Sequence, residues 1–124
     1  MRKKVLIAED EASILASLEF LMRDAGYNVR SVMRGDEVLT ATRNFVPDLI
    51  VLDVTLPQRS GFEICREIRE NSDWSQIRIV MLSARGRDRE VQRGLGAGAD
   101  AYITKPFATS ELCECVRMLL GHNC

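Results

Sequence analysis

Acidic residues directly follow the first apolar run of the chain, in the order Glu9-Asp10-Glu11, and a later apolar run ends at Asp53. Like charges held close together destabilise one another, so clustered carboxylates favour a bound cation. Mg²⁺ in proteins takes one or two carboxylates and keeps several waters. We interpret Glu9, Asp10 and Asp53 as a candidate cation site. The alternative is that these acids are solvated loop residues or helix caps, which is our interpretation of Glu11.

Two further polar residues follow apolar runs. Ser83 comes after residues 77–82, and Lys105 comes after residues 101–104. A lysine near these acids could simply neutralise them. Together with the cation and the Ser83 hydroxyl, it could also surround a phosphoryl group carried by Asp53, because phosphoryl transfer depends mainly on positioning and charge. The serine alone is weak evidence, since serine is common in turns and caps.

The elements that would position these residues alternate along the chain. Strands are expected at residues 5–8, 27–33, 48–53, 77–82 and 101–104, and helices at residues 14–22, 35–42, 62–68, 88–95 and 112–120. This alternation predicts an α/β fold with a doubly wound parallel sheet and helices on both faces. Ligands bind beyond the carboxyl ends of such strands. The polar residues lie at those ends.

Composition narrows the class of protein. The chain has 124 residues, which favours a single domain. Its net charge of -1 argues against a dedicated nucleic-acid surface. No apolar run approaches the roughly 20 residues that span a bilayer, so we expect a cytoplasmic protein without a membrane segment. The four cysteines are expected to be free thiols, because no secretory signal precedes them.

Three features are expected to carry no chemistry. Residues 94–99 satisfy G-x-G-x-x-A, but they end a predicted helix, whereas a dinucleotide fingerprint begins one. Acids interleave with the basic stretch of Arg85, Arg87, Arg89 and Arg93, which indicates a solvated helix start, with a partner-contact surface as the alternative. Trp74 is expected to cover the hydrophobic core.

The motifs themselves resemble a known family. I-A-E-D-E from residue 7, D-V-T-L-P-x-x-S-G-F-E from residue 53, L-S-A from residue 82 and G-A-D-A-Y-I-T-K-P-F from residue 98 are similar to the receiver domain of two-component response regulators, the CheY-like family. The resemblance runs from about Lys3 to Leu120. It implies one flavodoxin-like (βα)5 domain over residues 1–124, with strand order 2-1-3-4-5 and no output domain in this chain.

The resemblance also implies roles for the site residues. Asp53 would be the phosphoacceptor, taking a phosphoryl group from the phosphohistidine of a histidine kinase or phosphotransfer protein. Asp10 and Asp53 would ligate Mg²⁺, for which Mn²⁺ could substitute. Glu9 would act through a water, and the backbone carbonyl of Thr55 would complete the protein ligands.

Further roles concern the phosphoryl group and the switch. Lys105 and Ser83 would bind the phosphoryl oxygens, and Tyr102 would turn inward as Ser83 moves. The Lys105-Pro106 bond would be cis, an isomer that proline makes accessible. The readout surface would be the fourth helix, fifth strand and fifth helix, which would control a downstream protein or a covalently linked output domain.

One feature of the DNA-binding members of the family is not matched in this sequence. DNA-binding members often pair an acid and an arginine across a phosphorylation-dependent homodimer, and Ala101 and Cys115 stand in those places.

Two alternative functions compete with the receiver. One is an aspartyl-phosphate phosphatase of the haloacid dehalogenase type, which needs a second acid where Thr55 stands. Another is a degenerate receiver that acts as an interaction module without phosphorylation. We expect a switch rather than a turnover enzyme, with no direct nucleic-acid binding by this chain.

Overall fold

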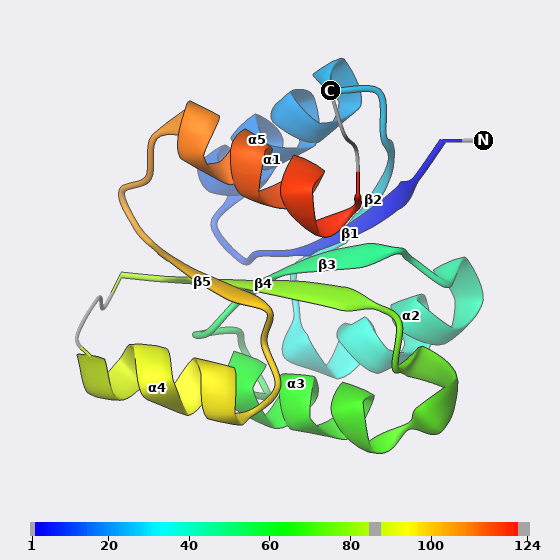
Figure 1. Ribbon diagram of the computed structural model, residues 1–124, viewed down its shortest axis with the longest axis vertical. Helices are drawn as coiled ribbons and strands as arrows, with labels where there is room; N and C mark the ends of the chain where they lie inside the picture. Colours follow the sequence, from blue (N-terminus) through cyan, green and yellow to red (C-terminus); the bar gives the residue numbers. More distant parts are fainter. Residues whose placement is uncertain (1, 85–87, 122–124) are drawn as a thin grey trace.

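Strands and helices alternate in the computed structural model, which describes residues 2–84 and 88–121 (Figure 1). The strands are β1 (Lys4–Ala8), β2 (Asn28–Val32), β3 (Leu49–Asp53), β4 (Arg78–Ser83) and β5 (Ala101–Thr104). The helices are α1 (Ala12–Asp24), α2 (Val38–Phe45), α3 (Gly61–Glu70), α4 (Asp88–Gly96) and α5 (Thr109–Leu119), with short 3-10 turns η1 (Gly35–Glu37) and η2 (Ser72–Trp74). The predicted alternation is confirmed.

The five strands form one parallel sheet in the order β2-β1-β3-β4-β5, which confirms the predicted fold. Its register pairs Ala8 with Leu52, Asp53 with Leu82, and Ser83 with Thr104. The carboxyl ends of β1, β3, β4 and β5 therefore meet at one edge. That edge collects the polar residues that follow each strand.

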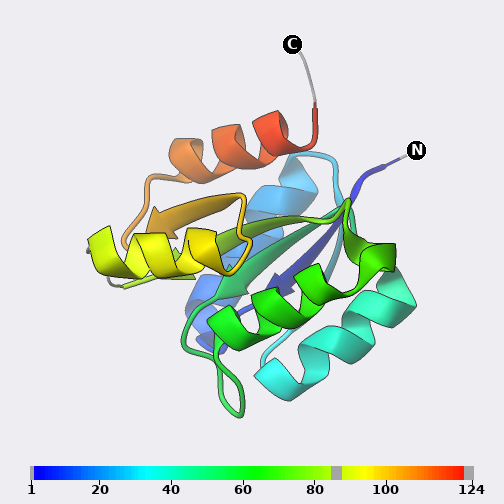
Figure 2. The same cartoon turned by 60° about the horizontal axis from the view of Figure 1, so that its bottom comes forward.

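Helices cover both faces of the sheet. Figures 1 and 2 show α1 and α5 on one face and α2, α3 and α4 on the other. The two faces bury separate hydrophobic clusters, centred on Leu18, Met22 and Leu112 on one side and on Phe62, Ile64 and Ile68 on the other. All five residues of β3 are buried. Its continuous apolar run is explained by burial on both faces.

Most element boundaries differ from the predicted ones by a few residues, and the differences at β2 and β4 have a clear structural basis. The second strand is shorter than residues 27–33, because Gly26 has a φ of 96° and the Tyr27 N–H donates to the Met22 carbonyl in the turn that follows α1. The fourth strand is shifted and includes Ser83, which therefore lies within the sheet rather than in a turn after it.

Other sequence interpretations are confirmed. Trp74 is partly buried against the core. Residues 94–99 end α4 and lead into β5, and Gly98 takes a φ of 109°, so they have the helix-then-strand order expected of a turn. Among the described residues, no helix is both long and apolar enough to cross a membrane.

Candidate functional site

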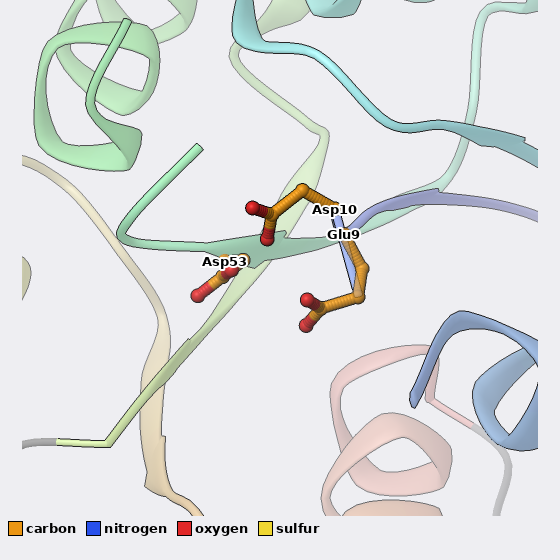
Figure 3. A group of neighbouring side chains, drawn as sticks. All are labelled: Glu9, Asp10 and Asp53. Atoms are coloured by element: carbon orange, nitrogen blue, oxygen red, sulfur yellow. The ribbon is translucent and has the colours of Figure 1, made fainter. Parts of the chain in front are cut away.

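Three carboxylates meet at the carboxyl edge of the sheet. Glu9 and Asp10 follow β1 and Asp53 ends β3, as Figure 3 shows. One carboxylate oxygen from each lies within 4.8 Å of the others. Glu9 and Asp53 are buried, with exposed fractions of 0% and 2%, whereas Asp10 is partly exposed. The structure thus brings together the three acids that the sequence singled out.

Lys105 supplies one positive charge to this cluster. Its Nζ lies 2.9 Å from Oε1 of Glu9 and 3.5 Å from Oδ1 of Asp53. Burial lowers the pKa of Lys105, but the hydrogen bond to Glu9 and the charges of Asp53 and Glu9 outweigh it and raise that pKa above 10.5. The lysine is therefore a permanent ammonium at the site.

Glu9 is held by two donors. Its Oε1 accepts from Lys105, and its Oε2 accepts the backbone N–H of Glu11 at 3.0 Å. Glu11 itself occupies the N-cap position of α1, in agreement with its interpretation as a helix-start acid. Because both Glu9 oxygens already have partners, this carboxylate is suited to acting on a cation from the second coordination sphere.

Asp53 carries unbalanced negative charge. Burial and the neighbouring charge of Glu9 raise its pKa from 3.8 to about 6, although Lys105 and a 3.4 Å hydrogen bond from the Thr55 N–H act in the opposite direction. Three acids face one lysine. This all-oxygen donor set fits a hard divalent cation such as Mg²⁺, and the bound charge would relieve the electrostatic penalty on Asp53.

The remaining predicted site residues border the same edge. Ser83 is buried, and its carbonyl accepts the Lys105 N–H at 2.7 Å, which ties β4 to the lysine. The Lys105-Pro106 peptide bond is cis. Thr55 is exposed, and it lines with Asp10 and Ser83 a pocket of about 730 Å³.

Tyr102 is half-buried on β5, and its ring lies against α4. A Cβ at Gly94 would lie 2.7 Å from Cδ2 of Tyr102, so the ring needs a glycine at this position of α4. Ala101 on β5 and Cys115 on α5 are partly buried against the core of the opposite face. These contacts were not visible in the sequence, because Gly94 was interpreted only as part of a helix stop.

A second glycine supports the acceptor directly. A Cβ at Gly61 would lie 2.6 Å from the Asp53 carbonyl oxygen, and the Gly61 N–H donates to the Val54 carbonyl at 2.8 Å. Ser60 caps α3 by accepting the Glu63 N–H. The sequence Ser60-Gly61 therefore starts α3 and lets its first turn pack on the end of β3.

The basic stretch is only partly described, and its interpretation needs correction at Arg93. Arg85 and Arg87 lie outside the described residues, as does the side chain of Arg89. The Arg93 guanidinium lies 4.3 Å from the centre of the Phe62 ring on α3. It is exposed, as the interpretation expected, but it lies in the last turn of α4 rather than at the helix start, and it lines the same pocket as Asp10 and Ser83.

The cysteines show no shared site among the described residues. Cys65, Cys113 and Cys115 are free, as predicted. Burial raises the pKa of the Cys65 thiol to about 11, which keeps it protonated and unreactive at neutral pH.

The sequence of this chain is similar to known proteins over most of its length. The family model described as the response regulator receiver domain matches residues 5–117 of this chain. The phosphate regulon transcriptional regulatory protein PhoB of Rhizobium meliloti is 39% identical over 120 residues, which cover 97% of this chain and 53% of PhoB. The chain thus spans about half the length of the curated relatives it matches.

Solved structures agree with the sequence relatives. A CheY-like receiver domain protein from Methanospirillum hungatei superposes with a TM-score of 0.89 at 28% identity, covering 97% of this chain and 94% of that one. The BeF3-activated N-terminal receiver domain of Klebsiella pneumoniae RstA gives 0.90 at 27% identity, covering 97% and 100%. Sequence, fold and the acidic edge lead to the same conclusion: the chain belongs to the receiver domain family of response regulators.

Proposed function

We propose that Asp53 accepts a phosphoryl group from the phosphohistidine of a histidine kinase or a phosphotransfer protein, which makes the chain a phosphorylation-dependent switch. The observation that carries the proposal is the burial of the Asp53 carboxylate between Lys105 and two other acids. Such a carboxylate is fixed in place and only partly neutralised, and the site is bordered by an open pocket.

In the proposed transfer, a carboxylate oxygen of Asp53 attacks phosphorus while the bond from phosphorus to the imidazole nitrogen breaks. The Lys105 ammonium would take up part of the new charge, and the Ser83 hydroxyl would donate to a phosphoryl oxygen. Asp10, Asp53 and the Thr55 carbonyl would hold Mg²⁺ or Mn²⁺, with Glu9 acting through water. The ion, when bound, supplies positive charge for the phosphoryl oxygens.

The switch would follow from the added charge. A phosphoryl group brings up to about two negative charges and new acceptors to the sheet edge. Ser83 would move toward it, and Tyr102 would fill the space behind. The changed surface of α4, β5 and α5 would control a downstream protein or an output domain, in the cytoplasm. We propose no turnover on external substrates, because Thr55 stands where a phosphatase of the haloacid dehalogenase type needs an acid.

Phosphorylation with a small donor tests this function. The chain is incubated with Mg²⁺ and acetyl phosphate, and intact mass is followed, since Trp74 precedes β4 at the opposite edge of the sheet and would report weakly. One hydroxylamine-labile phosphoryl group per chain, lost in Asp53→Asn, is expected. The absence of an adduct would favour the degenerate module. An adduct that survives Asp53→Asn would refute the assignment of the acceptor, and rapid release of phosphate over many turnovers would favour the phosphatase.

A further inference from the structure

A pocket of about 730 Å³ extends from the acidic edge along the segment between β3 and α3. Asp10, Thr55 and Ser83 line it near the acceptor, and Phe62 and Arg93 line it on α3 and α4. The pocket therefore gives a small molecule access to the acidic edge beside Asp53, away from the face of α1 and α5. Its charge decides which molecules enter.

Negative charge dominates the end of the pocket near Asp53. A phosphodonor is itself an anion, so Asp10 and Asp53 repel it before any transfer occurs. Lys105 is already engaged by Glu9 and Asp53. A second cation along the path would offset this repulsion.

Arg93 is such a cation. Its guanidinium stacks on the Phe62 ring, 4.3 Å from the ring centre, which fixes the charged group on an apolar platform. Phe62 is 4% exposed and directly follows Gly61, which packs against the Asp53 carbonyl. The residue that carries Arg93 is therefore next in sequence to a glycine that contacts the backbone of Asp53.

Among the side chains that the structure describes, no carboxylate forms an ion pair with Arg93. The other arginine of the pocket, Arg59, is paired with Glu67. A guanidinium that is held by stacking keeps its N–H donors for an anion, since stacking uses the face of the group and leaves its edge open.

We propose that Arg93 is a positioning residue that draws the dianionic phosphoryl group of small acyl phosphates into this pocket. The inference rests on the proposed function of Asp53. In the reaction with acetyl phosphate, a carboxylate oxygen of Asp53 forms the new bond to phosphorus. The bond from phosphorus to the acyl oxygen breaks, acetate leaves with the electron pair, and no proton is transferred.

The test compares phosphorylation rates in acetyl phosphate and Mg²⁺ for the wild type, Arg93→Gln, Arg93→Lys and the control Arg66→Gln. Arg66 is an exposed arginine of α3 outside the pocket, so its loss removes the same charge elsewhere. A solvent-screened cation acting on a dianion is worth about fivefold in rate. We expect that loss in Arg93→Gln, most of the rate in Arg93→Lys, and no change in Arg66→Gln.

Two further readouts separate charge from packing. The difference between wild type and Arg93→Gln should shrink as salt rises from 20 mM to about 500 mM, because screening weakens the attraction. Calorimetric titration should show that Arg93→Gln binds Mg²⁺ more tightly, since a repelling cation is gone. An unchanged rate, a rate loss indifferent to salt, or weaker Mg²⁺ binding would overturn the role of Arg93. Failure of the wild type to take up phosphate would instead overturn the function proposed for Asp53.

Discussion

Replacing Asp53 with asparagine should stabilise the protein when no divalent cation is present. The pKa of Asp53 is raised from 3.8 to about 6 by burial and by Glu9, so ionising this carboxylate costs more in the folded chain than in the unfolded one. The folded state binds the extra proton between these values. The free energy of unfolding therefore falls as pH rises through that window.

The size of this stability difference follows from the two pKa values of Asp53, 3.8 in the unfolded chain and about 6 in the folded one. At about 1.4 kcal/mol for each pKa unit, the penalty in the wild type reaches about 3 kcal/mol at pH 8 and about half of that at pH 5. Asparagine has the shape of the acid without its charge, so it removes the penalty. We expect Asp53→Asn to exceed the wild type by these amounts in urea unfolding with EDTA.

A control and a second condition make the test specific. Asp24→Asn removes one exposed charge from the end of α1 and should change stability by less than about 0.5 kcal/mol. Saturating Mg²⁺ should stabilise the wild type more than Asp53→Asn, by about 3 kcal/mol at a concentration 100 times the dissociation constant if the variant does not bind. If Asp53→Asn is no more stable than the wild type at pH 8 without metal, the electrostatic reasoning about this site is wrong.

Three further outcomes are expected. Lys105→Met should raise the pKa of Asp53 above about 6, because Lys105 lowers it in the wild type; carboxyl ¹³C NMR titration measures this, and an unchanged value contradicts it. Val46→Asn should gain about 1 kcal/mol in urea unfolding, because Val46 directly follows α2 with a φ of 51°, where a β-branched residue is strained and asparagine is tolerated; a loss of stability would disprove the strain. Gly94→Ala should displace the Tyr102 ring, since the new Cβ would lie 2.7 Å from Cδ2; unchanged NMR chemical shifts of that ring would refute this.

The acidic edge shows how far the sequence alone could reach. Asp53, Ser83 and Lys105 each terminate or follow an apolar run, and parallel strands bring their carboxyl ends to one edge, so their proximity was predictable. The strand order was available only through the family resemblance, because alternation by itself does not decide which strands are neighbours.

The contacts between residues of different elements were not predictable from spacing. Arg93 stacks on Phe62, and Tyr102 lies on Gly94, through pairs that belong to different elements. Local periodicity states which face of a helix is buried but not which residue of another helix it meets. That depends on how α3, α4 and β5 pack across the sheet.

The sequence by itself determined the element types and the chemistry of the edge, because strand and helix periods and carboxylate, hydroxyl and amine groups are local properties. The tertiary structure decided how that chemistry is tuned. It buries Glu9 and Asp53 to 0% and 2% exposure and sets one lysine among three acids. Desolvation and charge proximity depend on the packed surroundings of a residue. They raise the pKa of Asp53, and the residues next to Asp53 in the sequence do not predict this shift.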